Sequence, residues 1–151
     1  MKQLTYRYSL TSDPYQIKSE MATHEYGDQW ADAFRSVIER FPDRTVTFID
    51  DENRVLGIGG IIPIRPGTEE AWTTLDDEAK SILMTPKIWK EALDMLQDKH
   101  RVRRMQAMAS EEFAEELHGW LEYLGFEYEC THKEYDRGYD NHVYVRFMSW
   151  A

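Results

Sequence analysis

The stretch around Thr85 is the best candidate in the sequence for binding an anion. Thr85 is a good helix N-cap, Pro86 suits the first helical position, and apolar residues then recur at helical spacing as far as Lys99. The first backbone N–H groups of a helix have no partner within it and lie at the positive end of its dipole. The amides around Lys87 and Ile88, together with the Thr85 hydroxyl, are therefore suited to meet a phosphate.

Nearby acids and a missing motif count against this phosphate site. Asp76, Asp77 and Glu78 come shortly before the predicted helix and repel an anion. The segment between Leu75 and Pro86 contains no glycine, although phosphate loops use glycines so that backbone N–H groups reach the anion without Cβ atoms in the way. A plain capped helix therefore remains the competing interpretation.

The histidines and the cysteine form no metal-binding or nucleophile pattern. The histidines stand at positions 24, 100, 118, 132 and 142 and show no metal-ligand spacing within one element. The sequence contains no recognisable Ser-His-Asp or Cys-His arrangement. Cys130 is the only cysteine, which excludes an intrachain disulfide and favours a packing role in a reducing compartment.

Length and charge limit the fold and the partners. With 151 residues, 42% of them hydrophobic, the chain can bury its own core, and we expect a single domain over 1–151. The net charge of −10 disfavours nucleic acid and membrane surfaces as partners and favours an amine or a basic peptide or protein. The first residues lack a signal-peptide region and no run reaches membrane-spanning length, so we expect a cytoplasmic protein.

Hydrophobic periodicity predicts strands and helices in a definite order. Alternating and β-branched runs predict strands at 4–10, 45–51, 54–64, 68–75, 102–109, 127–138 and 142–150. Helical stripes predict helices at 29–41, 85–99 and 111–126. Hairpins and a β-α-β crossover in this order indicate a mixed α/β (α+β) domain built on one sheet.

Glycines mark special places within these elements. Gly57, Gly59 and Gly60 crowd one predicted strand and indicate a bulge or a close approach by other backbone. Gly125 is predicted to cap the end of the last helix, whose start Ser110 caps. The last pair of strands is predicted to turn at 138–141.

The element order and the sequence Leu124-Gly125-Phe126, which ends the last helix before a final strand pair, resemble the GNAT superfamily of acyl-CoA-dependent N-acetyltransferases. The resemblance covers essentially the whole chain and is one of layout more than of motif. It implies a GNAT-like fold with a mixed, mostly antiparallel sheet of about six or seven strands flanked by helices. It also implies transfer of an acetyl group from acetyl-CoA to an amine.

A narrower resemblance is to small GNAT-like proteins of short-tailed bacteriophages, some of which are internal virion proteins. It rests on the glycine-rich and Trp-bearing strands at 57–72 and on the terminal Gly-Phe hairpin unit. It implies an alternative in which a catalytically inactive protein serves virion assembly or binds a host factor, in the host cytoplasm or packaged in a virion. A homodimer stays open. An acidic decoy for a nucleic-acid-binding protein also stays open, and requires the acids at 111, 112, 115, 116, 127, 129 and 134 to share one face.

The resemblance nominates two segments for acetyl-CoA. In the family the backbone of a central strand pairs with the pantetheine arm, and the corresponding residues are Trp72, Thr73, Thr74 and Leu75. The helix start that holds the pyrophosphate corresponds to Thr85, Lys87 and Ile88. The glycine-containing loop of the family is absent before this helix, so this contact departs from the usual pattern.

The resemblance also nominates groups that move protons. Transfer to an amine needs a base for the ammonium and an acid for the departing thiolate. Glu70, at the start of the central strand, is the nominated base, with Glu69 beside it. The family's usual acid, a Tyr four residues before the glycine, is Leu121 here, which leaves Tyr123 and His118 on the same helix. For each candidate, an exposed polar residue without a catalytic role is the competing interpretation.

Overall fold

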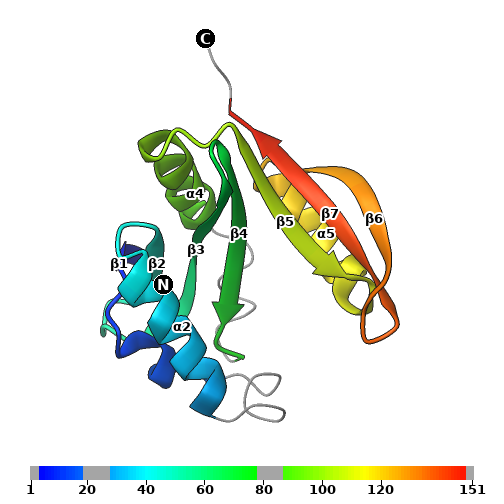
Figure 1. Ribbon diagram of the computed structural model, residues 1–151. Coiled ribbons are helices and arrows are strands. Elements are labelled where there is room, and N and C mark those ends of the chain that lie inside the picture. The colour runs from blue at the N-terminus through cyan, green and yellow to red at the C-terminus, as the bar shows by residue number, and fades with distance from the viewer. Residues whose placement is uncertain (1–3, 19–27, 78–86, 149–151) are drawn as a thin grey trace. The chain divides into compact units, whose positions relative to one another are not determined.

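The computed structural model describes residues 4–18, 28–77 and 87–148, which contain seven strands and three α-helices (Figure 1). The strands are β1 (Thr5–Tyr8), β2 (Thr45–Ile49), β3 (Val55–Arg65), β4 (Thr68–Leu75), β5 (Arg104–Ser110), β6 (Glu127–Asp136) and β7 (Tyr139–Phe147). The helices are α2 (Asp28–Arg40), α4 (Ile88–Lys99) and α5 (Ala114–Tyr123), with 3-10 turns η1 (Asp13–Gln16) and η2 (Glu111–Phe113). Every strand and helix predicted from the sequence is present.

The strands follow the order β1-β2-β3-β4-β5-β7-β6 in one sheet. The β4–β5 pair is parallel, whereas the β1–β2, β2–β3, β5–β7 and β6–β7 pairs are antiparallel. This confirms the predicted mixed α/β fold with a mostly antiparallel sheet flanked by helices. None of the helices in the described ranges is long and apolar enough to cross a membrane.

The chain divides into two compact units. The first contains 1–60 and 72–92, and the second contains 61–71 and 93–151. The candidate site residues divide in the same way. Trp72, Thr73, Thr74, Leu75, Lys87 and Ile88 belong to the first unit, and Glu70, His118 and Tyr123 belong to the second.

In the first unit, the glycines of β3 allow close packing on the sheet. A Cβ atom on Gly59 would lie 2.7 Å from Cζ3 of Trp89, and one on Gly60 would lie 2.3 Å from the carbonyl oxygen of Arg44. Trp89, in the first turn of α4, also packs on Phe48 of β2 with ring centroids 3.8 Å apart. The predicted close approach by backbone is confirmed at Gly60, whereas at Gly59 the nearest neighbour is an aromatic side chain.

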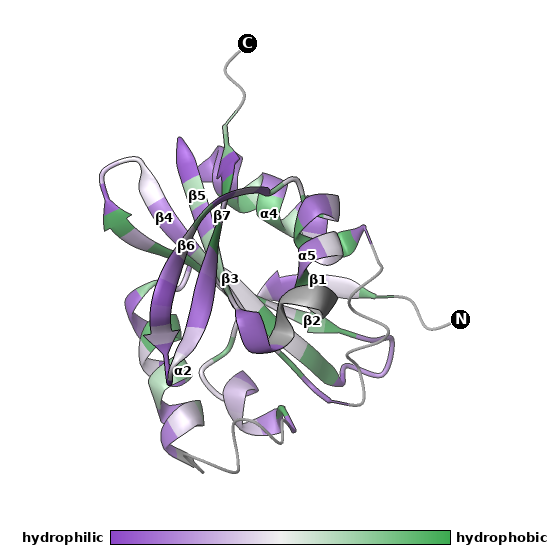
Figure 2. Ribbon diagram, turned by 90° about the vertical axis from the view of Figure 1, so that its right-hand side faces the viewer, coloured by the Kyte–Doolittle hydropathy of each residue, from purple (hydrophilic) through white to green (hydrophobic). Residues whose placement is uncertain are grey.

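In the second unit, α5 covers one face of β5 and β7. The buried residues of β5 alternate along the strand, as expected when one face is packed and the other is not. They are Met105, Ala107 and Ala109, and α5 contributes the buried residues Trp120 and Leu121. The edge strand β6 is mostly exposed, and Figure 2 shows hydrophilic residues along it.

Both ends of the last helical segment carry the predicted caps. The Ser110 hydroxyl accepts a hydrogen bond from the Glu112 N–H at 3.4 Å. At the other end Gly125 has φ +94°, and its N–H donates to the carbonyl of Glu122 at 3.0 Å. Phe126 N–H reaches back to the helix as well, which completes a Schellman motif.

The final hairpin turns earlier than predicted. Arg137 and Gly138 both have positive φ, 51° and 85°, and Asp136 pairs with Tyr139 across them. The turn therefore consists of residues 137 and 138, a geometry typical of a tight hairpin. The predicted turn at 138–141 is wrong beyond Gly138, because β7 already begins at Tyr139.

Candidate functional site

The start of α4, which the sequence analysis nominated for the pyrophosphate, belongs to the first unit. Lys87 is exposed, and the helix begins at Ile88. The Glu91 N–H donates to the carbonyl of Lys87 at 3.0 Å. The amide of Ile88 belongs to the first turn of α4, where N–H groups have no partner within a helix. Buried Trp89 fixes this turn on the sheet. Thr85, the predicted N-cap, lies outside the described residues.

The acid closest to β4 in sequence is buried and accepts hydrogen bonds. Asp76 is 1% exposed. Its Oδ2 accepts the backbone N–H of Lys18 at 3.1 Å, and its Oδ1 lies 3.4 Å from the guanidinium of Arg54. These donors reduce the repulsion that Asp76 exerts on an anion, whereas Asp77 is exposed.

The side chain of Trp72 on β4 belongs to an aromatic cluster. Phe34 of α2 has its ring 4.8 Å from the ring of Trp72 and 4.8 Å from that of Trp30. The indole Nε1 of Trp72 is buried and has no hydrogen-bond acceptor among the described residues. Buried N–H groups are almost always paired, so this donor fits an acceptor atom supplied by a ligand or by water.

The rest of the nominated strand segment lies beside β3. The hydroxyl of Thr73 donates to the carbonyl of Ile58 at 3.1 Å. Thr74 and Leu75 are half-buried. A ligand that pairs with strand backbone places little demand on these side chains, so their identities are compatible with the predicted role.

Glu70 in the second unit is a half-buried carboxylate on β4. It pairs with Gln106 of β5 across the parallel strands. Burial raises the pKa of Glu70 above its ordinary value, and no charged group among the described residues opposes this. A raised pKa makes Glu70 a stronger base once ionised, which is the property required of a group that takes a proton from an ammonium.

His118 of α5 links a buried tyrosine to a carboxylate. Its Nδ1 lies 2.9 Å from the hydroxyl of Tyr144 on β7, and its Nε2 lies 3.0 Å from Oε1 of Glu122. Tyr144 is 3% exposed, whereas the side chain of His118 is 50% exposed. Burial, followed by the negative charge of Glu122, raises the pKa of Tyr144. The three side chains form a continuous polar chain from the sheet to solvent.

Near the Leu-Gly-Phe sequence, α5 carries two more positions that the family resemblance singles out, Leu121 and Tyr123. Leu121 is 6% exposed and packs into the core. Tyr123 is 43% exposed, and its hydroxyl has no hydrogen bond to another described residue. An exposed surface residue is therefore the simpler interpretation of Tyr123.

Glu70 and His118 lie on opposite faces of the sheet within the second unit. Glu70 pairs with Gln106, and Tyr144 pairs with the next residue of β5, Ala107. Paired residues share a face, and successive residues of a strand alternate between faces. The structure therefore brings His118 together with Tyr144, but not with Glu70.

Sequence reasoning missed both partners of His118. Glu122 follows His118 by four residues on one helix, so the spacing that joins them was visible in the sequence. The contact with Tyr144 depends on β7 lying between β5 and β6, and no local signal in the sequence gives that pairing.

Comparisons with known proteins identify the fold. No family model and no curated protein matches the sequence. Among solved structures, a spermidine N-acetyltransferase SpeG chimera from Vibrio cholerae and hSSAT matches with a TM-score of 0.77 and 18% identity, over 96% of this chain and 95% of that one. A GNAT-family acetyltransferase from Bacillus anthracis matches with a TM-score of 0.73 and 13% identity, over 97% and 98%. A ribosomal-protein-S5-alanine acetyltransferase from Vibrio fischeri matches with a TM-score of 0.72 and 15% identity, over 97% and 94%. The chain therefore has the GNAT fold.

Proposed function

We propose that the protein is an N-acetyltransferase that moves an acetyl group from acetyl-CoA to an amine. The GNAT fold supports this proposal, and one observation carries it beyond the fold. Glu70, on β4, is half-buried with a pKa raised by burial, which suits a base that deprotonates an incoming ammonium. We treat 1–151 as one functional domain.

The residues of the first unit fit the chemistry of acetyl-CoA in part. Acetyl-CoA would supply an activated acetyl thioester, and it carries a pyrophosphate. The backbone of Trp72, Thr73, Thr74 and Leu75 is assigned to its pantetheine arm. We assign the pyrophosphate to the exposed Lys87, to the amide of Ile88 and to Thr85, which lies outside the described residues. The buried, unpaired indole N–H of Trp72 is suited to an acceptor atom such as an amide carbonyl.

The acceptor is proposed to be a cationic amine or a basic peptide or protein. The net charge of −10 attracts cations and repels polyanions. One structural neighbour is named for spermidine, a polyamine. We place the protein in a cytoplasm, and propose neither a nucleic-acid nor a membrane partner; a homodimer is compatible with this role.

An inactive GNAT-fold protein is the second candidate function. Leu121, at the position of the family's usual tyrosine acid, is buried and has no proton to give. The segment before α4 has no glycine for a phosphate loop. A phage protein that serves virion assembly or binds a host factor is free to lose both features.

We do not propose an acidic decoy. Two of its acids are in ion pairs, Glu112 with Arg137 at 3.2 Å and Glu129 with Arg104 at 2.5 Å. These two charges are partly compensated within the chain, which weakens the acidic surface that a decoy needs.

The test of cofactor binding is a thermal melt with and without acetyl-CoA. Ligand at one hundred times its dissociation constant stabilises the fold by about 2.7 kcal/mol, which raises the melting temperature by several degrees. We expect Lys87→Ala to reduce the shift, and Lys90→Ala, which removes another exposed lysine of α4, to leave it unchanged.

The test of catalysis is release of free CoA thiol in the presence of a polyamine or a lysine-rich peptide. Release that depends on the amine supports the transferase. If millimolar acetyl-CoA gives no melt shift and no amine stimulates release, the transferase proposal is overturned and the inactive protein is favoured.

A further inference from the structure

The indole N–H of Trp72 is a buried hydrogen-bond donor that the first unit leaves unused. Trp72 lies on β4 in that unit, and its Nε1 has no acceptor among the described residues. A buried donor in this state has lost its contact with water and has gained no protein acceptor in return. Such a group calls for an acceptor atom from outside the chain.

The packing of the Trp72 ring explains its position but not this donor. Phe34 of α2 lies between Trp30 and Trp72, with its ring centroid 4.8 Å from each of theirs. Both tryptophans also pack on a buried apolar cluster, which consists of Ile17, Val55 and Ile58. A purely hydrocarbon ring at position 72 would pack in the same way without burying an N–H group.

A water molecule is a poor partner for this donor. A buried water usually makes about three hydrogen bonds to polar groups that lack other partners. The side chains that pack on the Trp72 ring carry no free polar atom, because they are those of Phe34 and of the apolar cluster. The hydroxyl of the next residue, Thr73, already donates to the carbonyl of Ile58 at 3.1 Å. These surroundings favour a ligand atom over water.

We propose that Trp72 is a specificity-determining residue whose indole N–H binds an amide carbonyl oxygen of the ligand. This inference rests on the proposed transferase function. The indole nitrogen can only donate, so its partner must be an acceptor. An amide carbonyl accepts through two lone pairs, whereas a protonated polyamine, like a lysine ammonium, offers donors alone. A polyamine therefore cannot satisfy Trp72, although one structural neighbour is named for spermidine.

Two ligands of the proposed reaction carry amide carbonyls. Acetyl-CoA has them in its pantetheine arm, which we assign to the backbone of Trp72 and the residues that follow it on β4. A peptide or protein acceptor has a carbonyl in every residue of its backbone. Either ligand brings the same kind of atom to Nε1, so the two sources are distinguished by adding each ligand alone.

We expect ligand binding to turn the Trp72 ring. Nε1 itself is covered, but the residue as a whole is only half-buried, so part of its side chain reaches the surface. A rotation of the side chain brings the donor to that surface. The new hydrogen bond then offsets the packing that the ring loses when it turns.

The first experiment follows the indole N–H signals by NMR of the full-length protein, isotopically labelled at tryptophan. The signal of Trp72 is assigned through its connections to its own backbone, so the assignment needs no variant. Acetyl-CoA, a lysine-rich peptide and spermidine are added separately. We expect one of the two amide ligands to move the Trp72 proton signal downfield, as a new hydrogen bond does, and spermidine to leave it in place. The ligand that moves the signal is the source of the carbonyl.

The second experiment compares ligand affinity in Trp72→Phe and Trp30→Phe. Both variants replace an indole of the same cluster by a smaller aromatic ring, but the Nε1 of Trp30 is not a buried atom without a partner. We expect Trp72→Phe to weaken binding of the amide ligand about 10-fold, because the ligand carbonyl loses its donor. We expect Trp72→Phe to leave spermidine binding unchanged, and Trp30→Phe to keep the affinity for both ligands. A thermal melt of each variant checks that it is folded.

The outcomes separate the role of Trp72 from the proposed function. If an amide ligand raises the melting temperature without moving the Trp72 signal, or if spermidine moves it equally, the role is wrong and the transferase stands. Equal losses of affinity in folded Trp72→Phe and Trp30→Phe also overturn the role, because they assign the effect to ring packing. If no ligand shifts the melt and no amine stimulates release of CoA, the transferase itself is wrong and the role of Trp72 is overturned with it.

Discussion

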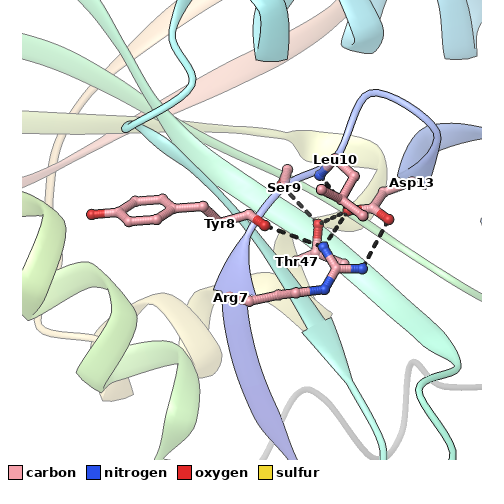
Figure 3. A network of polar contacts seen from close by, with 6 residues as sticks. All are labelled: Arg7, Tyr8, Ser9, Leu10, Asp13 and Thr47. Carbon is pink, nitrogen blue, oxygen red and sulfur yellow. Dashed lines mark hydrogen bonds and ion pairs between the residues drawn. The ribbon is translucent and has the colours of Figure 1, made fainter.

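The carboxylate of Asp13 is fully buried and accepts hydrogen bonds from both terminal nitrogens of the Arg7 guanidinium, at 2.7 and 3.0 Å (Figure 3). The same carboxylate accepts the Thr47 hydroxyl at 2.7 Å and the Leu10 N–H at 2.8 Å. It therefore joins η1 to β1 and β2 in the first unit. A buried charge is tolerated only when its oxygens are satisfied, and here the donors come from three separate segments.

Removing this carboxylate should destabilise the fold strongly. Asp13→Ala leaves Arg7 without its partner, and breaking a buried pair costs several kcal/mol; because the Arg7 side chain is 35% exposed and can be solvated, we expect about 3 kcal/mol. The measurement is the urea midpoint at neutral pH, with an unchanged m-value.

The matched control is an exposed ion pair of α2. Glu39→Ala removes the partner of Arg35, and both side chains are 54% exposed. We expect a loss of about 0.3–0.5 kcal/mol, as for other exposed helix pairs. Equal losses in the two variants would contradict the role assigned to Asp13.

The contribution of Asp13 should depend on pH. Burial alone would raise the pKa of Asp13, but hydrogen bonds from Arg7, Thr47 and Leu10 outweigh it and lower the pKa. A lowered pKa in the folded state means that the stabilisation is complete above the unfolded value of about 3.9 and is lost as the pH falls through the folded value.

We therefore expect the difference in unfolding free energy between wild type and Asp13→Asn to be largest at neutral pH and to shrink below about pH 4. Urea unfolding of both proteins at several pH values measures it. A difference that stays constant into acid would mean that the ionised carboxylate is not the stabilising form.

Local signals were enough to predict many of the elements. The residue pattern of 68–75 predicted β4 with the bounds that the structure has. Gly125 predicted the end of the last helix, because a residue with left-handed backbone conformation is needed there. The hairpin turn was misplaced because Arg137 adopts positive φ, which its residue type does not favour. The pairing of Asp136 with Tyr139 imposes that conformation.

Long-range pairing decided the features that the sequence could not predict. Asp13 lies in a polar stretch that is typical of an exposed turn, yet it is buried because Arg7 and Thr47 lie on neighbouring strands. The same holds for the candidate site. Residue types and the family resemblance nominated His118, but its contact with Tyr144 required the position of β7 in the sheet.

The glycines of β3 and of α5 should respond oppositely to alanine. At Gly60 a Cβ would lie 2.3 Å from the carbonyl oxygen of Arg44, which is backbone and cannot turn away, so Gly60→Ala should cost about 3 kcal/mol. Gly59→Ala, facing the ring of Trp89 at 2.7 Å, should also destabilise.

Gly119 is the matched control, since it lies within α5 and a Cβ there meets nothing within 4 Å. Gly119→Ala should stabilise by about 0.5–1 kcal/mol, because alanine loses less backbone freedom in a helix. Thermal and urea unfolding measure the stability of all three variants. A stable Gly60→Ala protein would show that β3 does not approach residue 44 as described.

If the protein is the proposed transferase, the pH dependence of turnover should show the ionisation of Glu70. A base acts only when ionised, and burial raises the pKa of Glu70, so kcat/KM should fall as the pH is lowered through a value above the ordinary one of about 4.3. Glu70→Gln cannot accept the proton and should lower kcat/KM by about 100-fold while removing this acid limb. Glu127→Gln, which changes an exposed carboxylate of β6, should keep both the rate and the limb. An acid limb that persists in folded Glu70→Gln would assign the base to another group, because the glutamine does not titrate.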